Sequence, residues 1–480
     1  MDASRLRNDA LAIAAAAIEG VRPERLVDRR LGIDAGELLI DGRSLAAPLR
    51  LPAAGRIALV GGGKAAAGLA GGLARLLEDA GVCRDRLTGL VSVPEGCGGT
   101  GAGIEIRETR PAAVNLPTAR VVEATREMRA LLEGLTPADL AIAVISGGGS
   151  AVVEAPRAGV PLEDLIAVAS HLSAAGAEIT ELNLVRQAGS EVKGGGLARA
   201  CRAGRLLVVV LSDVIGDPLE FIASGPCLPV AERAAEALAV LERYGAVAAE
   251  VAPRLVAVLQ ADADRERASP PDGPGARRGM PSSAPAGTWT TPAGCRVDHL
   301  LLAGNATAVE AAAGAAGQLG YAVTVRPAEP GQRETADQAG CRLAREGVAV
   351  LAMAAADGRP RAIIEGGEAV VRLPEGHGRG GRNQQTAVAA LAELAGAGAA
   401  WPAGLLVASL GTDGEDGPTD AAGGVIDAAV AAAAEQRGLD PAAAAARCDA
   451  WPFLDACGGL LVTGPTGTNV ADIRIVLARP

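Results

Sequence analysis

The chain has 480 residues, more than a single hydrophobic core usually supports, so we expect two or more domains. Hydrophobic residues make up 49% of the chain but aromatic residues only 1%, a composition that predicts aliphatic, helix-rich cores. The formal net charge of −11 argues against a nucleic-acid partner, because binding to phosphate backbones requires a basic surface.

From about Arg56 onward, short aliphatic runs, glycine turns and Ala/Leu helical patterns alternate, as is typical of βα units around a parallel sheet. The predicted fold class is therefore α/β, with two three-layer α/β/α domains. The strands we expect, in chain order, are 56–60, 140–145, 206–211, 300–303, 322–326, 362–365, 405–409, 460–463 and 471–477.

A stretch rich in Pro, Gly and Ser at 269–291 predicts a linker or surface loop. It would separate an N-terminal domain, 1–268, with a Rossmann-like and mostly parallel sheet, from a C-terminal domain, 292–480. The glycine-rich segment 463–469 before the last strand reads as a hairpin and suggests that the second sheet is mixed.

No segment has the run of about 20 strongly apolar residues that a membrane span needs. The eight cysteines form no CxxC pair and stand at no zinc-ligand spacing from a histidine. We therefore expect a cytoplasmic protein with reduced thiols and no membrane partner.

Only two of the 45 basic residues, Lys64 and Lys193, are lysines. A chain that otherwise uses arginine indicates that these two positions need a compact ammonium group. Both lie in glycine-rich turns. The alternative is that these two lysines remain by chance and have no special role.

The first glycine turn, Gly61 to Gly63, follows a predicted strand and places Lys64 at the start of a helix. Backbone N–H groups and the helix dipole there favour an anion. The turn lacks the spacing of a Walker A loop, and it matches a dinucleotide fingerprint only at Gly61, Gly63 and Ala66. A merely tight turn is the alternative.

The second strand ends in Ser146-Gly147-Gly148-Gly149-Ser150, whose glycines can form a nest of amides for a phosphate. A serine nucleophile does not fit, since Val152 stands where a hydrolase elbow has glycine. The alternative is a sharp strand-to-helix turn.

A cationic segment follows, in which Arg186 suits a carboxylate and Lys193 suits a phosphoryl oxygen, unless both are solvated surface cations. The third strand opens into Asp213 and Asp217, which can hold Mg²⁺ or accept the proton of a substrate hydroxyl. Turn-forming aspartates are the alternative. The motif Ala223-Ser224-Gly225-Pro226 comes next.

The C-terminal half also contains glycine-rich turns beside charged residues. They are Gly366-Gly367-Glu368 and the turn that leads into Arg382, Asn383 and Gln384. An acidic loop at 411–420 contains Asp413 and does not have the ligand spacing of an EF-hand. Together, these loops offer backbone amides, basic side chains and carboxylates but no group for covalent catalysis. This combination favours phosphoryl transfer.

These loops, in this order, resemble the class II glycerate 2-kinase family, of the MOFRL type and often labelled hydroxypyruvate reductase. The shared motifs are GGGK, SGGGS, N-x-x-R with KGG, SDV-x-GD, GGE, GRGGRNQ, GTDG-x-DGPTDAAG and TGPTGTN. The resemblance implies an ATP- and Mg²⁺-dependent kinase that converts D-glycerate to 2-phosphoglycerate in a cleft between two α/β domains. The partners it implies are ATP and glycerate, with a homodimer as the assembly.

Carried onto this chain, the resemblance makes Lys64, Lys193, Asp213 and Arg382 the catalytic candidates, with Asp213 and Asp413 as metal ligands. The candidates for binding substrate or phosphate are Gly62, Gly63, Ser146, Gly147, Gly148, Gly149, Ser150, Asn183, Arg186, Gly194, Glu368, Asn383, Thr466 and Asn469. The chain departs from the family at 110–115, where a His-Pro-x-Pro-Asp segment is usual, and at Gln385, where an acid is usual.

Two rival functions are an NAD(P)-dependent hydroxypyruvate reductase, which would use Gly61, Gly63 and Ala66, and a non-catalytic anion-binding protein. A reductase does not need a second lysine-glycine turn or two acidic loops. A binding protein would hold a ligand without turnover.

Overall fold

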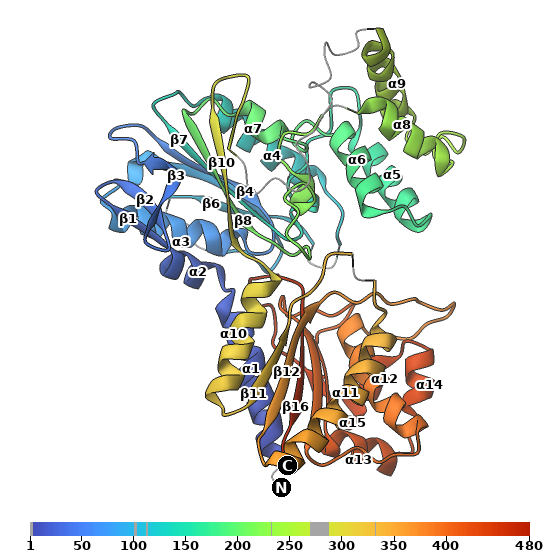
Figure 1. The fold of residues 1–480 in the computed structure, drawn as a ribbon. Coiled ribbons are helices and arrows are strands. Elements are labelled where there is room, and N and C mark those ends of the chain that lie inside the picture. The colour runs from blue at the N-terminus through green and yellow to red at the C-terminus, as the bar shows by residue number, and fades with distance from the viewer. Residues whose placement is uncertain (1–2, 100–102, 112–113, 232, 269–287, 332) are drawn as a thin grey trace. The chain divides into compact units, whose positions relative to one another are not determined.

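The structure, a computed structural model, describes residues 3–99, 103–111, 114–231, 233–268, 288–331 and 333–480 (Figure 1). The chain divides into two compact units. The seven-stranded unit comprises residues 26–211 and 217–302, and the six-stranded unit comprises residues 1–25, 212–216 and 303–480.

The main sheet of the seven-stranded unit has the strand order β6-β5-β4-β7-β8-β10-β9. Strands β4 to β8 pair in parallel, and β9 is antiparallel to its neighbour β10. The first six strands have the order of doubly wound nucleotide-binding sheets, which confirms the predicted mostly parallel sheet. The bounds are β4 Ile57–Gly62, β5 Leu87–Pro94, β6 Glu105–Arg110, β7 Leu140–Ser146, β8 Arg205–Leu211, β9 Trp289–Thr290 and β10 Arg296–Ala303.

The central strands of this sheet are buried along their whole length, because helices cover it as they cover other parallel sheets. In α3, Leu69, Leu73 and Leu77 recur every fourth residue and are buried. Four further helices, α5, α6, α8 and α9, share a core of their own. The helices are α2 Pro23–Arg30, α3 Ala66–Asp79, η1 Arg84–Arg86, α4 Ala119–Glu133, η2 Gly149–Ala151, α5 Leu162–Ala174, α6 Ile179–Gly189, α7 Gly196–Ala200, η3 Ile222–Ser224, α8 Ala234–Arg243 and α9 Pro253–Ala268.

The unit also contains a small antiparallel sheet that the sequence did not reveal, with the order β1-β2-β3. Its strands are β1 Leu31–Asp34, β2 Glu37–Ile40 and β3 Arg43–Arg50. They are partly exposed and lack the longer aliphatic runs by which the other strands were predicted.

The sheet of the six-stranded unit has the order β11-β12-β16-β13-β14-β15. Strands β11 and β12 are parallel and the other pairs are antiparallel, which confirms the predicted mixed sheet. The predicted hairpin is wrong, because β16 is buried throughout and lies in the centre, whereas β15 pairs only with β14 at an edge. The bounds are β11 Ala322–Arg326, β12 Arg361–Gly367, β13 Leu405–Gly411, β14 Gly423–Ile426, β15 Leu460–Leu461 and β16 Asp472–Ala478.

Within this unit, α1 and α10 lie on one face of the sheet and α11 and α12 lie on the other, which gives the predicted three layers (Figure 1). The core on the α11 and α12 side is built from Ala, Leu, Val and Ile with Trp401 and Phe453. The helices are α1 Ala3–Gly20, α10 Asn305–Gln318, α11 Ala336–Asp357, α12 Arg382–Gly396, α13 Ala428–Gln436, α14 Pro441–Ala446 and α15 Ala450–Cys457.

The unit boundaries differ from the expected 268/292 division. Helix α1 belongs to the six-stranded unit, where Arg7 pairs with Asp427 at 2.8 Å and Asp9 accepts a 2.7 Å bond from Tyr321. Strand β10, expected in the second domain, completes the sheet of the first. Most of the predicted linker, 269–287, lies outside the described residues, and its end forms β9. None of the described helices has the length and apolarity needed to cross a membrane.

Candidate active site

In the seven-stranded unit, two glycine turns meet at the carboxyl ends of the adjacent parallel strands β4 and β7. This is the position at which the strand order reverses, where doubly wound sheets bind their ligands. The Lys64 amide donates to the Gly147 carbonyl at 2.9 Å. A Cβ atom built at Gly148 would lie 3.7 Å from Lys64 Cγ and 3.7 Å from Arg110 Nη2. The structure thus brings Lys64 and Arg110 to the loop 147–150.

The glycines of the first turn have a packing role. A Cβ atom at Gly62 would lie 2.6 Å from the Ser92 carbonyl oxygen, and one at Gly63 would lie 2.2 Å from Ser146 Oγ. The Gly63 amide donates to Ser92 at 3.2 Å, and the Ala65 amide donates to Ser146 Oγ at 3.1 Å. These amides were expected to bind an anion, but they donate hydrogen bonds to Ser92 and Ser146 of the protein itself. Ser146 is fully buried.

The second turn, residues 147–150, keeps the features of an anion nest. Gly148 has a φ of +75°, and a left-handed residue in such a run turns successive amides toward one side. Among the described residues, none of the four amides of 147–150 donates to a backbone carbonyl in a turn or loop. Of the predicted phosphate-binding residues, Gly147, Gly148, Gly149 and Ser150 therefore fit that role best.

Lys193 lies behind this loop. Its ammonium group donates to the Ser150 carbonyl at 3.0 Å and forms an ion pair with Glu154, and both side chains are 2–3% exposed. Burial lowers the pKa of Lys193, although the Glu154 charge opposes this shift. In the structure Lys193 contacts the loop through the Ser150 carbonyl, and Glu154 is a partner that the sequence did not reveal.

The other predicted polar residues of this unit also support the loop. Asn183 is 2% exposed, and its Oδ1 accepts a 2.8 Å bond from Ser224. The Gly194 amide donates to the Ser224 carbonyl at 3.1 Å. Burial lowers the pKa of Arg186, and the charge of nearby Glu154 opposes the shift. Asn183 and Gly194 thus lie behind the site rather than within it.

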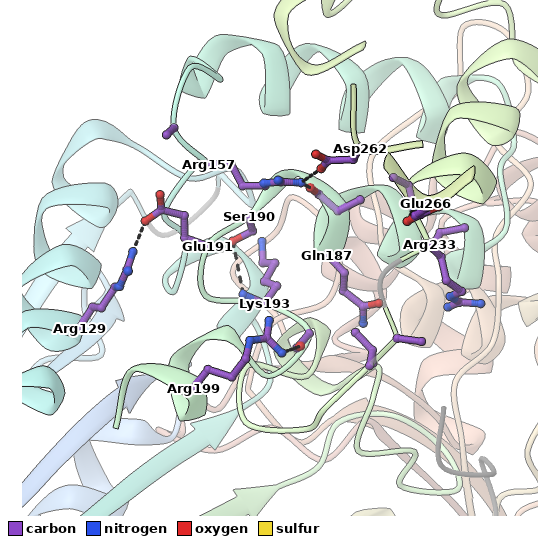
Figure 2. Close-up of a pocket in the computed structure, with 17 residues that line it drawn as sticks. Arg129, Arg157, Gln187, Ser190, Glu191, Lys193, Arg199, Arg233, Asp262 and Glu266 are labelled. Carbon is purple, nitrogen blue, oxygen red and sulfur yellow. Dashed lines mark hydrogen bonds and ion pairs between the residues drawn. The ribbon is translucent and has the colours of Figure 1, made fainter. Parts of the chain in front are cut away.

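A cavity of about 430 Å³ is lined by Gln187, Ser190, Lys193 and Gly194 among others (Figure 2). Its charged side chains pair with one another, as Arg157 does with Asp262 and Arg129 with Glu191 (Figure 2). The lining contains five basic side chains, Arg129, Arg157, Lys193, Arg199 and Arg233, and three acidic ones, Glu191, Asp262 and Glu266.

In the six-stranded unit, Arg382 begins α12 and is held by two acids. It donates to both Asp472 oxygens, at 2.7 and 2.9 Å, and it lies 3.1 Å from Glu368 Oε1. Burial alone would lower the pKa of Arg382, but the Asp472 carboxylate raises it above its usual range. Asp472, only 1% exposed at the start of β16, was missed from the sequence.

The predicted metal ligands lie near this arginine. The pKa of Glu368 is raised, first by burial of its carboxylate and then by the charges of Asp472, Asp213 and Asp413, while Arg382 opposes the shift. Residues 212–216 fold with the six-stranded unit, so Asp213 and Asp413 share it. Within the described ranges, no three or more His, Cys, Asp or Glu side chains are placed to hold a metal ion by themselves.

Asp416 fixes the start of α12. Its carboxylate accepts bonds from the amides of Asn383 at 3.0 Å and Gln384 at 2.8 Å, and Asn383 Oδ1 accepts a 2.5 Å bond from Ser409. Burial raises the pKa of Asp416 to about 6. A Cβ atom at Gly381 would lie 2.3 Å from the Asp416 carboxyl carbon. The amides expected to bind phosphate thus bind Asp416 instead, and Asn383 has a supporting role.

The end of the chain supports the acidic loop. The Thr466 hydroxyl donates to the Thr412 carbonyl at 2.7 Å, and its amide donates to the Asp413 carbonyl at 3.2 Å. Asn469 Oδ1 accepts a 3.2 Å bond from the Ala471 amide. Gln385, which replaces the usual acid, is buried and donates to Asp337 at 2.7 Å. These contacts hold the loops without showing a direct contact to substrate.

A second cavity, of about 190 Å³, lies beside Gly367 and Glu368. Its wall includes Arg474, which is 3% exposed and donates to Glu365 at 2.7 Å. Arg342 also pairs with Glu365, at 2.7 and 2.9 Å. This buried network of ions fixes the end of β12, from which Glu368 extends toward Arg382.

Comparison with known proteins identifies the family. Residues 9–260 match the domain of unknown function DUF4147, and residues 361–472 match the MOFRL family. The chain is 35% identical over 518 residues to the glycerate kinase of Bos taurus, covering 96% of this chain and 91% of that protein. It is 35% identical over 363 residues to the D-glycerate 2-kinase of Thermotoga maritima, covering 75% of this chain and 78% of that protein.

A crystal structure of a glycerate kinase from Thermotoga maritima matches with a TM-score of 0.76 and 31% identity, covering 99% of this chain and 100% of that one. The match therefore extends over both units and over the loops described above. The chain belongs to the class II, MOFRL-type glycerate kinase family and is a kinase.

Proposed function

We propose that this enzyme transfers the γ-phosphoryl group of ATP to D-glycerate and forms 2-phosphoglycerate, with Mg²⁺ as the metal. The observation that carries the proposal is Arg382, held by Asp472 and Glu368 close to Asp213 and Asp413. A fixed guanidinium surrounded by carboxylates can face the negative charge of a phosphoryl group and of its metal ion. The relatives' names, glycerate kinase and D-glycerate 2-kinase, supply the acceptor.

Phosphoryl transfer depends on charge stabilisation and positioning more than on covalent chemistry. In the proposed reaction the acceptor hydroxyl oxygen bonds to the γ-phosphorus, and the bond from that phosphorus to the bridging oxygen of ATP breaks. Asp213 takes the hydroxyl proton. In the six-stranded unit, Arg382 faces an oxygen of a phosphate or of the substrate carboxylate. In the seven-stranded unit, Lys64 and the amides of 147–150 offer donors for phosphate oxygens.

The acids of the six-stranded unit fit Mg²⁺. This ion prefers oxygen ligands, keeps several waters and is usually held by one or two carboxylates together with substrate phosphates. Asp413 would be such a carboxylate, which leaves Asp213 as the base, so a complete protein cage is not required. When bound, the ion would neutralise charge on the transferring group.

The test is a steady-state assay of the purified chain with ATP, Mg²⁺ and D-glycerate, in which ADP release is followed and the product is passed directly to enolase. We expect ADP release and a product that enolase accepts without a mutase. Chelation should abolish turnover, and added Mg²⁺ should restore it. NADH oxidation with hydroxypyruvate and no ADP release would instead establish the reductase, and ligand binding without turnover would establish a binding protein.

Variants test the observation itself. Arg382→Ala should lower kcat at least about tenfold, because it removes a preorganised charge from the site. Arg345→Ala is the matched control, since Arg345 is 67% exposed on α11 and pairs only at the surface with Glu393. An Arg382→Ala enzyme with wild-type kcat and KM would refute the proposed site.

The eight cysteines are all free thiols. Because disulfides form in oxidising compartments, their absence from these cysteines supports the proposal of a cytoplasmic location.

A further inference from the structure

The segment Ala223 to Gly225 contains an uncommon backbone conformation. Ala223, Ser224 and Gly225 have φ values of +52°, +61° and +63°, so two consecutive residues with side chains adopt the left-handed region. This conformation is unfavourable for residues other than glycine, and it persists only where the surrounding structure enforces it. Ser224 is also fully buried.

Ser224 connects three segments of the seven-stranded unit. Its hydroxyl donates to Asn183 Oδ1 on α6 at 2.8 Å and lies 3.0 Å from Ser150 Oγ. Because a hydroxyl has one hydrogen, Ser150 is the donor in the second bond. The Ser224 carbonyl accepts bonds from the Gly194 amide at 3.1 Å and from Gln187 Nε2 at 3.3 Å.

The left-handed turn also fits against the glycine loop. A Cβ atom built at Gly149 would lie 2.6 Å from Ala223 Cβ, so the two segments are in direct contact. Ser150 is therefore held at both ends, with its carbonyl bound to Lys193 and its hydroxyl bound to Ser224. A one-residue change in either partner would release one end of the loop.

We propose that Ser224 is a positioning residue for the kinase reaction. It transmits the position of Asn183 to Ser150 and thereby fixes the amides of 147–150 in the orientation that receives the phosphate chain. The strained backbone at Ala223 and Ser224 is maintained because only this conformation directs the Ser224 hydroxyl toward Ser150 and its carbonyl toward Gly194. The kinetic part of this proposal rests on the proposed function.

Two substitutions separate the hydroxyl from the backbone. Ser224→Ala removes the hydroxyl and keeps the strain, whereas Ser224→Gly removes both. We expect Ser224→Gly to melt about 2–4 °C above Ser224→Ala, since glycine adopts this conformation freely. We expect both to lower kcat to the same extent, about tenfold, with little change in the KM for glycerate. If Ser224 merely supported the fold, activity would follow stability and Ser224→Gly would be nearly as active as the wild type.

A double-mutant cycle tests the connection to the loop. Ser150→Ala combined with Ser224→Ala should be no slower than the slower single variant, because both remove the same hydrogen bond. Additive losses would overturn the relay.

Hydrogen exchange provides a readout that does not depend on the reaction. Amides of a peptide covering 146–153 should exchange faster in both Ser224 variants than in the wild type. Thr291→Val is the control, since it deletes another buried hydroxyl of this unit, which accepts a 3.1 Å bond from the Cys295 amide. Unchanged exchange would overturn the proposal. A wild-type enzyme that fails to phosphorylate glycerate would refute the proposed function, and the exchange result would still decide this inference.

Discussion

Replacing Asp416 with asparagine tests whether a buried charge is kept at the start of α12 at the expense of stability. Asp416 is 2% exposed, and burial raises its pKa from 3.8 to about 6. A shift of about two pKa units corresponds to about 3 kcal/mol. Because the folded state binds this proton more tightly than the unfolded state, the free energy of unfolding contributed by this group falls as pH rises from about 4 to about 6. Above that range it is constant.

Asparagine cannot ionise, so the variant lacks this dependence. The free energy of unfolding of Asp416→Asn minus that of the wild type should therefore increase by about 3 kcal/mol between pH 4 and pH 7 and then level off. Urea unfolding followed by tryptophan fluorescence measures it, because Trp401 and Trp451 both lie in the six-stranded unit. Asp440→Asn, at the exposed start of α14, is the control for removing the charge of a capping residue without burial.

A difference between wild type and Asp416→Asn that stays constant from pH 4 to pH 7 would refute this reasoning. The same variant should lower kcat at pH 7.5 at least about tenfold, because the charged carboxylate binds the amides of Asn383 and Gln384 next to Arg382. A stabilised but less active enzyme is the combination expected when a charge is retained for function.

Two further substitutions test the glycine loop and its support by urea unfolding. Lys193→Met leaves Glu154 buried without its ion-pair partner and should destabilise the protein by about 3–5 kcal/mol. The double variant Lys193→Met/Glu154→Gln should recover most of that loss. Equal stabilities of the single and double variants would contradict the pairing. Gly63→Ala should destabilise by about 2 kcal/mol or more, because its Cβ atom would lie 2.2 Å from Ser146 Oγ. Gly314→Ala on α10, whose Cβ atom would meet nothing within 4 Å, should be neutral or stabilise by up to about 1 kcal/mol, and similar losses in both would show that the close approach at Gly63 is unimportant.

The sequence predicted the strands that are aliphatic runs and missed several whose sequences are not. Strands β4, β7 and β8 are aliphatic runs, and a parallel sheet covered by helices requires such runs. Strand β3 contains two arginines, a serine and a proline and is mostly exposed, and β14 begins with two glycines. Such segments form strands because their neighbours pair with them, and this information is not local.

The meeting of Lys64 with the loop 147–150 could be predicted, because turns that follow adjacent parallel strands lie at one edge of a sheet. The partners of the charged residues could not. Lys193 pairs with Glu154 across 39 positions, and Arg382 pairs with Asp472 across 90. Of these partners, Asp472 is the one for which the sequence contains a signal. It is an acid at the start of an aliphatic strand, and an acid that is buried with such a strand needs a partner.

Because lysine is scarce in this chain, the two positions that retain it indicate where the space for a cation is limited. Limited space at a position is a different property from contact with phosphate. Lys193 is kept in a site where its ammonium group fits between Glu154 and the Ser150 carbonyl, with 2% of the side chain exposed. A planar guanidinium with five donors would leave several of them unsatisfied there. Lys64 is half-buried, and its Cγ would lie 3.7 Å from a Cβ at Gly148. Both lysines therefore adjoin the same glycine loop, Lys193 through the Ser150 carbonyl and Lys64 beside Gly148.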